Sequence, residues 1–242
     1  MSLVKDLSHS ILEQILAKLP FKEDLSLPQN LKSLSSAMSP DPVGGARVFE
    51  DKESGSKLVY IGLTVPMIAL DSHMLFCFSK SDSLVPHFTL DAVAAGEHYA
   101  YHLDLIPRVD LSCHPDYLFE VYEPLNDSFK KAESIKGLSK AHLEPLQLAY
   151  MSPWMLAHRA DLAAMDKVGV IAGEYLNHWL SLSCSGMKSK SSFSSSQITE
   201  RDRQHRTMLF SPKVDPVWAK VTKMVGKESC DGLRSLLLPA CP

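Results

Sequence analysis

Five short segments between residues 44 and 108 alternate in the way that β-strands do, and they limit the folds open to this chain. They read GARVFED, KLVYIGLTV, HMLFCFS, HFTLDAV and HYAYHLDLI, and short polar stretches such as KESGS and KSDSLVP separate them. Short strands in succession with tight turns are typical of an antiparallel meander. The sequence therefore predicts a central antiparallel sheet over about residues 44–108.

Helical patterns lie on both sides of this region along the chain. A helical lead is predicted within residues 2–40, where 2–20 is amphipathic and too acidic for a secretory or transit signal. More helices are predicted within 114–238, including one over 152–165 and one that ends at Gly226, and a mobile Ser/Lys loop is predicted at 185–197. Strands followed by helices indicate an α+β fold. Helices at both chain ends could cover both faces of the sheet, so we expect residues 1–242 to form a single α/β/α sandwich domain.

Composition and motifs argue against several classes of function. The chain has 242 residues and a net charge of −3, so a nucleic-acid or anionic-membrane surface is not indicated. No apolar run approaches the ~20 residues that span a bilayer. No G-x-G-x-x-G, Walker A, G-x-S-x-G or H-E-x-x-H motif is present. Nothing in the chain is therefore shaped to bind NAD, FAD or ATP phosphates.

The last two predicted strands carry most of the candidate site residues. Side chains alternate between the faces of a strand, so the titratable groups of this hairpin share one face. A turn at 94–97 would pair Asp91 with Ala100 and Thr89 with His102, leaving Asp91 and His102 as diagonal neighbours. One hypothesis is a cleft where Asp91 and His102 exchange protons with a ligand. The alternative is a solvated sheet face, which shows the same alternation.

Other candidate residues lie in the predicted C-terminal helices. Asp202 and Arg206 have the spacing of a surface ion pair, and the alternative for Arg206 is a carboxylate-binding role. Asp215 precedes Pro216, a common pair at a helix start, so capping is the structural alternative for Asp215. His98 and His102 share a spacing with metal ligands, but no third ligand is marked, and no metal is predicted.

Several sequence blocks spread over residues 70–226 are characteristic in their order and spacing: HFTLDAV, HLDLIPRVDL, HPDYLFEVY, YMSPWMLAHRAD and ERDRQHR followed by VDPVWAKVTKMVG. In these blocks the chain resembles the red chlorophyll catabolite reductases, a branch of the ferredoxin-dependent bilin reductases. The resemblance implies an α/β/α sandwich with an open-chain tetrapyrrole between the sheet and the C-terminal helices. It implies no bound nicotinamide, flavin or metal. Reduced ferredoxin would deliver single electrons, and side chains would protonate a radical intermediate.

The resemblance also implies roles for particular residues. Asp91 stands where the plant enzymes usually have Glu, and it would be the main proton donor. Asp215 is the best match for a second acid, and His102 is similar to a histidine of the bilin reductases. A further strand Asp of those enzymes has no clear counterpart here. Thr89 and Arg206 are the expected substrate-binding residues on grounds other than the resemblance: Thr89 lies on the titratable face of the hairpin, and the planar guanidinium of Arg206 suits a propionate.

The expected function is therefore ferredoxin-dependent reduction of red chlorophyll catabolite to primary fluorescent chlorophyll catabolite. Three alternatives stay open: reduction of biliverdin to a phytobilin, a tetrapyrrole carrier without chemistry, and a structural or interaction domain. The expected partners are ferredoxin and the tetrapyrrole, and a homodimer is left open. The expected compartment is the chloroplast stroma in a photosynthetic eukaryote and the cytoplasm otherwise.

Overall fold

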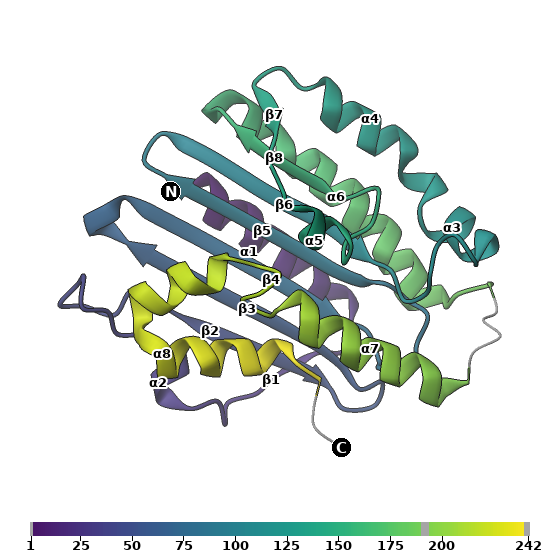
Figure 1. Cartoon of the computed structure of the whole chain (residues 1–242), viewed down its shortest axis with the longest axis horizontal. Helices are drawn as coiled ribbons and strands as arrows, with labels where there is room; N and C mark the ends of the chain where they lie inside the picture. The colour runs from purple at the N-terminus through teal and green to yellow at the C-terminus, as the bar shows by residue number, and fades with distance from the viewer. Residues whose placement is uncertain (1, 190–193, 240–242) are drawn as a thin grey trace.

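An eight-stranded antiparallel sheet forms the centre of the part of the chain that the computed structural model describes, residues 2–189 and 194–239 (Figure 1). The strand order is β1-β2-β3-β4-β5-β6-β8-β7. The strands are β1 (Lys22–Glu23), β2 (Gly44–Asp51), β3 (Ser56–Val65), β4 (Leu70–Phe78), β5 (His87–Ala95), β6 (His98–Ile106), β7 (Leu138–Lys140) and β8 (Leu156–Ala160). Strands β2 to β6 are consecutive neighbours, which confirms the predicted meander.

Helices cover both faces of this sheet, as Figure 1 shows. One face carries α1 (Leu3–Lys18), α3 (Pro115–Val121), the 3₁₀ turn η2 (Glu123–Leu125), α4 (Asn126–Ser134) and α6 (Leu162–Ser185). The other carries α2 (Gln29–Lys32), α7 (Ser195–Leu209) and α8 (Val217–Leu237). The short η1 (Pro66–Ile68) and α5 (Pro145–Leu148) lie in connections. The predicted α+β, three-layer α/β/α sandwich is therefore confirmed. No described helix is both long enough and apolar enough to cross a membrane.

The two-sided cover explains why the central strands are nearly continuous apolar runs. On β4, Leu75 and Cys77 enter the core under α1 and α6, whereas Met74 and Phe76 enter the core under α7 and α8. A strand that is buried on both faces loses the apolar–polar alternation of a half-exposed strand.

The predicted helix over 152–165 is wrong in its first half. Residues 156–160 form β8, which pairs with β6 on one side and β7 on the other. Leu156, His158 and Ala160 point inward, whereas Arg159 is exposed, so the segment has the period of a strand. Helix α6 begins only after Asp161, whose carboxylate accepts a hydrogen bond from the Ala164 N–H at 2.8 Å.

Helix boundaries elsewhere follow the sequence in part. The helical lead 2–40 contains α1, but it also holds strand β1, and α2 spans only four residues. The predicted loop 185–197 begins at the end of α6 and runs into α7, which Ser194 caps; residues 190–193 lie outside the described residues. Gly226 interrupts α8 with a φ of 80°, but the helix resumes and continues to Leu237.

Candidate functional site

The β5–β6 hairpin sets the register of the candidate acid and histidine. Ala95 pairs with His98 across a two-residue turn, so Asp91 lies directly opposite His102 and Thr89 opposite Asp104. The predicted register is therefore wrong by two residues. Because side chains alternate with a period of two, this error leaves the predicted faces unchanged.

A cleft of about 230 Å³ lies over this face, between the sheet and the C-terminal segment. Met74, Phe76 and Val93 are among the residues of its floor. The opposite side is formed largely by the α7–α8 connection and the first turn of α8, with Phe210, Val214, Asp215, Val217 and Trp218. Asp91, His102, Thr89 and Asp215 all line this one cleft, and none of its described lining residues is a lysine or an arginine.

Asp91 is placed to hold a proton near neutral pH. Its Oδ1 atom is buried and has no hydrogen-bond partner among the described residues. Burial disfavours the carboxylate form, and the charge of Asp215 disfavours it further, so the pKa of Asp91 rises to about 7. A carboxylic acid with such a pKa can both keep and release a proton under ordinary conditions.

His102 faces Asp91 from the next strand. Its Nε2 atom is also buried without a hydrogen-bond partner in the described part of the chain. Burial lowers the pKa of His102 to about 4, so the imidazole is neutral at pH 7. Unsatisfied buried polar atoms cost free energy. Two of them on paired residues beside one cleft indicate that a ligand completes their hydrogen bonds.

Asp215 combines both of the roles that the sequence left open. Its Oδ1 accepts a hydrogen bond from the Val217 N–H at 3.0 Å, at the start of α8. The residue also lines the cleft, where burial raises its pKa against the opposing effects of the Val217 bond and the Lys220 charge. The cleft therefore carries an acid on its floor and a second acid on its wall.

Asp104 is a buried acid that the sequence analysis did not select. It is fully buried next to Thr89, whose hydroxyl donates to the Asp104 carbonyl oxygen at 3.4 Å. The Asp104 carboxylate accepts from the Ser152 N–H at 2.9 Å and the Ser152 hydroxyl at 2.5 Å. Burial raises the pKa of Asp104 to about 7 although these bonds lower it. The contact between Asp104 and Ser152 holds the segment that places Met151 against the cleft. The sequence carried one signal for this residue, because strand alternation puts Asp104 on the same face of the hairpin as His102.

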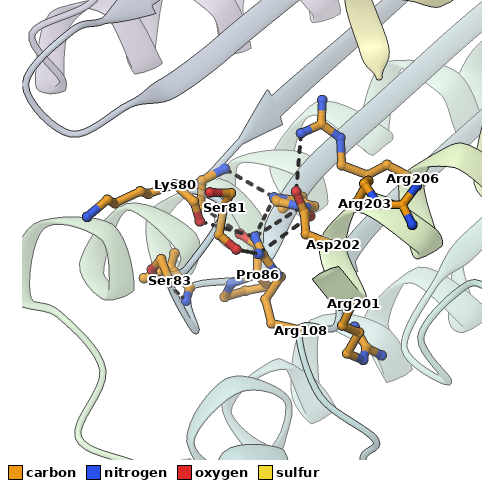
Figure 2. Close-up of polar contacts among 12 residues, drawn as sticks. Lys80, Ser81, Ser83, Pro86, Arg108, Arg201, Asp202, Arg203 and Arg206 are labelled. Carbon is orange, nitrogen blue, oxygen red and sulfur yellow. Dashed lines mark hydrogen bonds and ion pairs between the residues drawn. The ribbon is translucent and has the colours of Figure 1, made fainter. Parts of the chain in front are cut away.

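Arg206 lies outside the cleft, in a separate buried cluster (Figure 2). Its guanidinium stacks 3.6 Å from the centre of the Phe78 ring and donates two hydrogen bonds to the Leu237 carbonyl oxygen, at 2.6 and 3.0 Å. Its bond to Asp202 spans 3.4 Å, and both residues are at most 5% exposed. The surface ion pair predicted from the sequence is therefore wrong, because the pair is in the interior. The structure does not bring Arg206 together with Asp91.

Two partners complete the environment of Asp202. His87 Nε2 lies 2.6 Å from Asp202 Oδ1, and an Arg108 nitrogen lies 3.5 Å from the same oxygen. Arg108 also donates to the Ser81 carbonyl oxygen at 2.6 Å. The cluster joins α7 to the sheet. Among the described residues, no group of three or more His, Cys, Asp or Glu side chains is arranged to hold a metal ion.

Comparison with known proteins adds one finding. No family model matches the sequence, and no curated protein matches it. Among the solved structures with a similar fold is the crystal structure of selenomethionine phytochromobilin synthase from tomato in complex with biliverdin. The chain shares this fold. The TM-score is 0.70 at 19% sequence identity, and the match covers 96% of this chain and 82% of that chain. The likeness thus extends over nearly the whole chain, including the strands and helices that build the cleft.

Proposed function

We propose that this protein is a ferredoxin-dependent reductase of a linear tetrapyrrole. The observation that carries the proposal is the cross-strand pair of Asp91 and His102, whose unpartnered polar atoms lie beside an apolar cleft that Asp215 also lines. The fold supports it, because the similar structure from tomato is a phytochromobilin synthase with biliverdin bound. A tetrapyrrole-binding carrier needs the apolar cleft but has no use for two acids with raised pKa values.

The proposed chemistry is a reduction by two electrons and two protons. Two reduced ferredoxins each supply one electron, and each electron is followed by a proton to the tetrapyrrole, so that charge does not accumulate in the apolar cleft. Asp91 donates as the main acid, and its pKa of about 7 leaves a large protonated fraction at neutral pH. Neutral His102 offers a hydrogen bond without a competing positive charge. Asp215 lies on the wall, and its own raised pKa lets its protonated form donate the second proton. In its ionised form the charge of Asp215 raises the pKa of Asp91.

Two substrates are proposed. Red chlorophyll catabolite follows from the sequence resemblance, with primary fluorescent chlorophyll catabolite as the product. Biliverdin fits at least as well, because the structural neighbour holds it. In a photosynthetic eukaryote we propose the chloroplast stroma as the compartment.

An anaerobic assay with reduced ferredoxin tests this function directly. We expect one of the two substrates to lose its long-wavelength absorbance in the presence of protein and ferredoxin, and NADPH alone to give no turnover. Binding of either tetrapyrrole at micromolar protein, followed by absorbance, is the accompanying measurement. If a tetrapyrrole binds but is not reduced, the carrier alternative replaces the reductase. If neither tetrapyrrole binds, both the reductase hypothesis and the carrier hypothesis are wrong.

Asparagine at position 215 should change the pH dependence of the reaction. The protonated form of Asp91 is present below its pKa of about 7 and is lost above it, so the single-turnover rate of the wild type should fall as the pH rises through about 7. Asp215→Asn removes a charge that raises this pKa, so the fall should move to lower pH. Melting should change little, because Asn can accept the Val217 hydrogen bond as Asp does. If the variant and the wild type show the same pH dependence of the single-turnover rate, Asp215 only caps α8.

A further inference from the structure

A run of lysines covers the outside of the cleft wall. Between Pro212 and Lys227 the chain has a single acid, Asp215, although its overall net charge is −3. The four lysines of this stretch are all exposed: Lys213, Lys220, Lys223 and Lys227. Lys213 precedes α8 and the other three lie on it, and we call the four residues together the α8 lysine face. It is the outer side of the segment whose inner side, with Val214, Asp215 and Trp218, lines the cleft.

Three of these lysines have no acidic partner in the described part of the chain. No carboxylate lies within 4 Å of the ammonium groups of Lys213, Lys220 or Lys223, whereas Lys227 pairs with Asp231. Lys220 and Lys223 are three residues apart and therefore share a face of the helix. Exposed charges that no internal partner neutralises create a positive potential at the surface, and such a potential attracts an acidic protein.

We infer that the α8 lysine face is the docking surface for the electron donor, an acidic iron–sulfur protein of the plant-type ferredoxin class. This inference rests on the proposed function. The positive charge of these lysines favours an acidic partner. Their position next to the cleft indicates that this partner is the electron donor. One helix, roughly 10–12 Å across with its side chains, separates a protein docked on this face from the cleft. The buried Trp218 ring lies within that helix, at the wall of the cleft.

The position of α8 strengthens the assignment. The other face of the sheet is covered by α1, α3, α4 and α6 (Figure 1), so a donor docked there would be separated from the cleft by both a helical layer and the sheet. The first turn of α8 lines the cleft with Val217 and Trp218. After the interruption at Gly226 the second half of the helix lies against α2, where Gly232 is next to Leu31. The lysines and the cleft are thus two sides of one short segment.

The test is the double variant Lys213→Glu with Lys223→Glu. Lys220 is kept, because its charge lowers the pKa of Asp215 and its loss could alter the chemistry itself. The matched control is Lys130→Glu with Lys167→Glu, two exposed lysines on α4 and α6 of the opposite layer, which changes the net charge equally. The measurements are the KM for reduced plant-type ferredoxin, calorimetric binding of oxidised ferredoxin, and kcat with a small chemical reductant.

We expect the double variant to raise the KM and the Kd for ferredoxin about 10-fold or more at ~0.01 M ionic strength, with a much smaller effect near 1 M. The rate with the chemical reductant and the tetrapyrrole affinity should match the wild type. The control should leave all these quantities unchanged. Equal ferredoxin affinity in wild type and double variant, or an equal loss in the control, would overturn the docking surface. Because ferredoxin binding is measured without turnover, a failure of docking is distinguishable from an absence of tetrapyrrole reduction by any donor, which would overturn the proposed function.

Discussion

Replacing Asp91 by asparagine should lower single-turnover reduction about 10²–10⁴-fold, the usual contribution of a general acid, while the tetrapyrrole still binds. The amide is nearly isosteric with the carboxyl group, so the shape of the cleft is kept. It cannot release a proton at any pH near neutrality, so the step that Asp91 supports should be lost. The measurement is single-turnover reduction with saturating tetrapyrrole, together with the tetrapyrrole Kd from absorbance.

The control for this variant lies on the same hairpin. Glu97→Gln changes an exposed acid at the turn between β5 and β6, outside the cleft, and should leave both the rate and the affinity unchanged. A wild-type rate in Asp91→Asn would remove Asp91 from proton transfer. Loss of binding together with rate would mean that the residue shapes the cleft instead.

Asparagine at position 202 should destabilise the protein by about 3–5 kcal/mol, the usual effect of removing one partner from a buried ion pair. Asp202 is 2% exposed and lies between the buried guanidinium groups of Arg108 and Arg206. Its loss leaves both charges in the interior without a counter-charge, and the bond to His87 loses its charged acceptor. Denaturant unfolding followed by circular dichroism measures the change.

The pH dependence of this effect identifies its cause. Burial alone would raise the pKa of Asp202, but the His87 hydrogen bond and the neighbouring charges outweigh it and lower the pKa to about 2. A lowered pKa means that the stabilising effect is complete above the unfolded value of about 3.9 and is lost as the pH falls through about 2. The difference between wild type and variant should therefore be constant from neutral pH to about pH 5 and shrink below it. Glu200→Gln, which removes one ion-pair partner of Arg203 on the exposed surface of the same helix, should show no comparable loss.

The faces of the hairpin could be predicted from the sequence, whereas its register could not. Alternation along each strand assigns Asp91 and His102 to one face whatever the turn, since any register shift by two preserves the face. Choosing the turn required knowing that Gly96 adopts a positive φ of 62° between Ala95 and His98. That is a property of the folded backbone, and the Ala-Ala-Gly stretch allows more than one turn position.

The buried position of Arg206 could not be predicted from the neighbouring sequence, for a different reason. Asp202 and Arg206 have the spacing of a surface pair, and their burial depends on the packing of α7 against β5. His87 and Asp202 are 115 residues apart in the sequence, and neither segment alone indicates the other. The same applies to β8, where pairing with β6 outweighs the helix signal of Ser152 and Pro153. Asp91 was found because strand alternation is a local pattern. The helix start at Asp215 indicated only capping, and its role as a second acid came from the family resemblance.

The division of the cleft between floor and wall has a consequence for synthesis of the chain on the ribosome. The part of the floor that β4, β5 and β6 form has been made when β6 ends at Ile106, but α8 begins only at Val217. At the usual elongation rates of ~5–20 residues per second, the intervening stretch of about 110 residues takes roughly 5–20 s to make. During that interval we expect the nascent chain to expose Met74, Phe76 and Val93, which line the cleft in the folded protein. Helix α8, which completes the cleft, should therefore also cover this apolar and aggregation-prone surface at the end of synthesis.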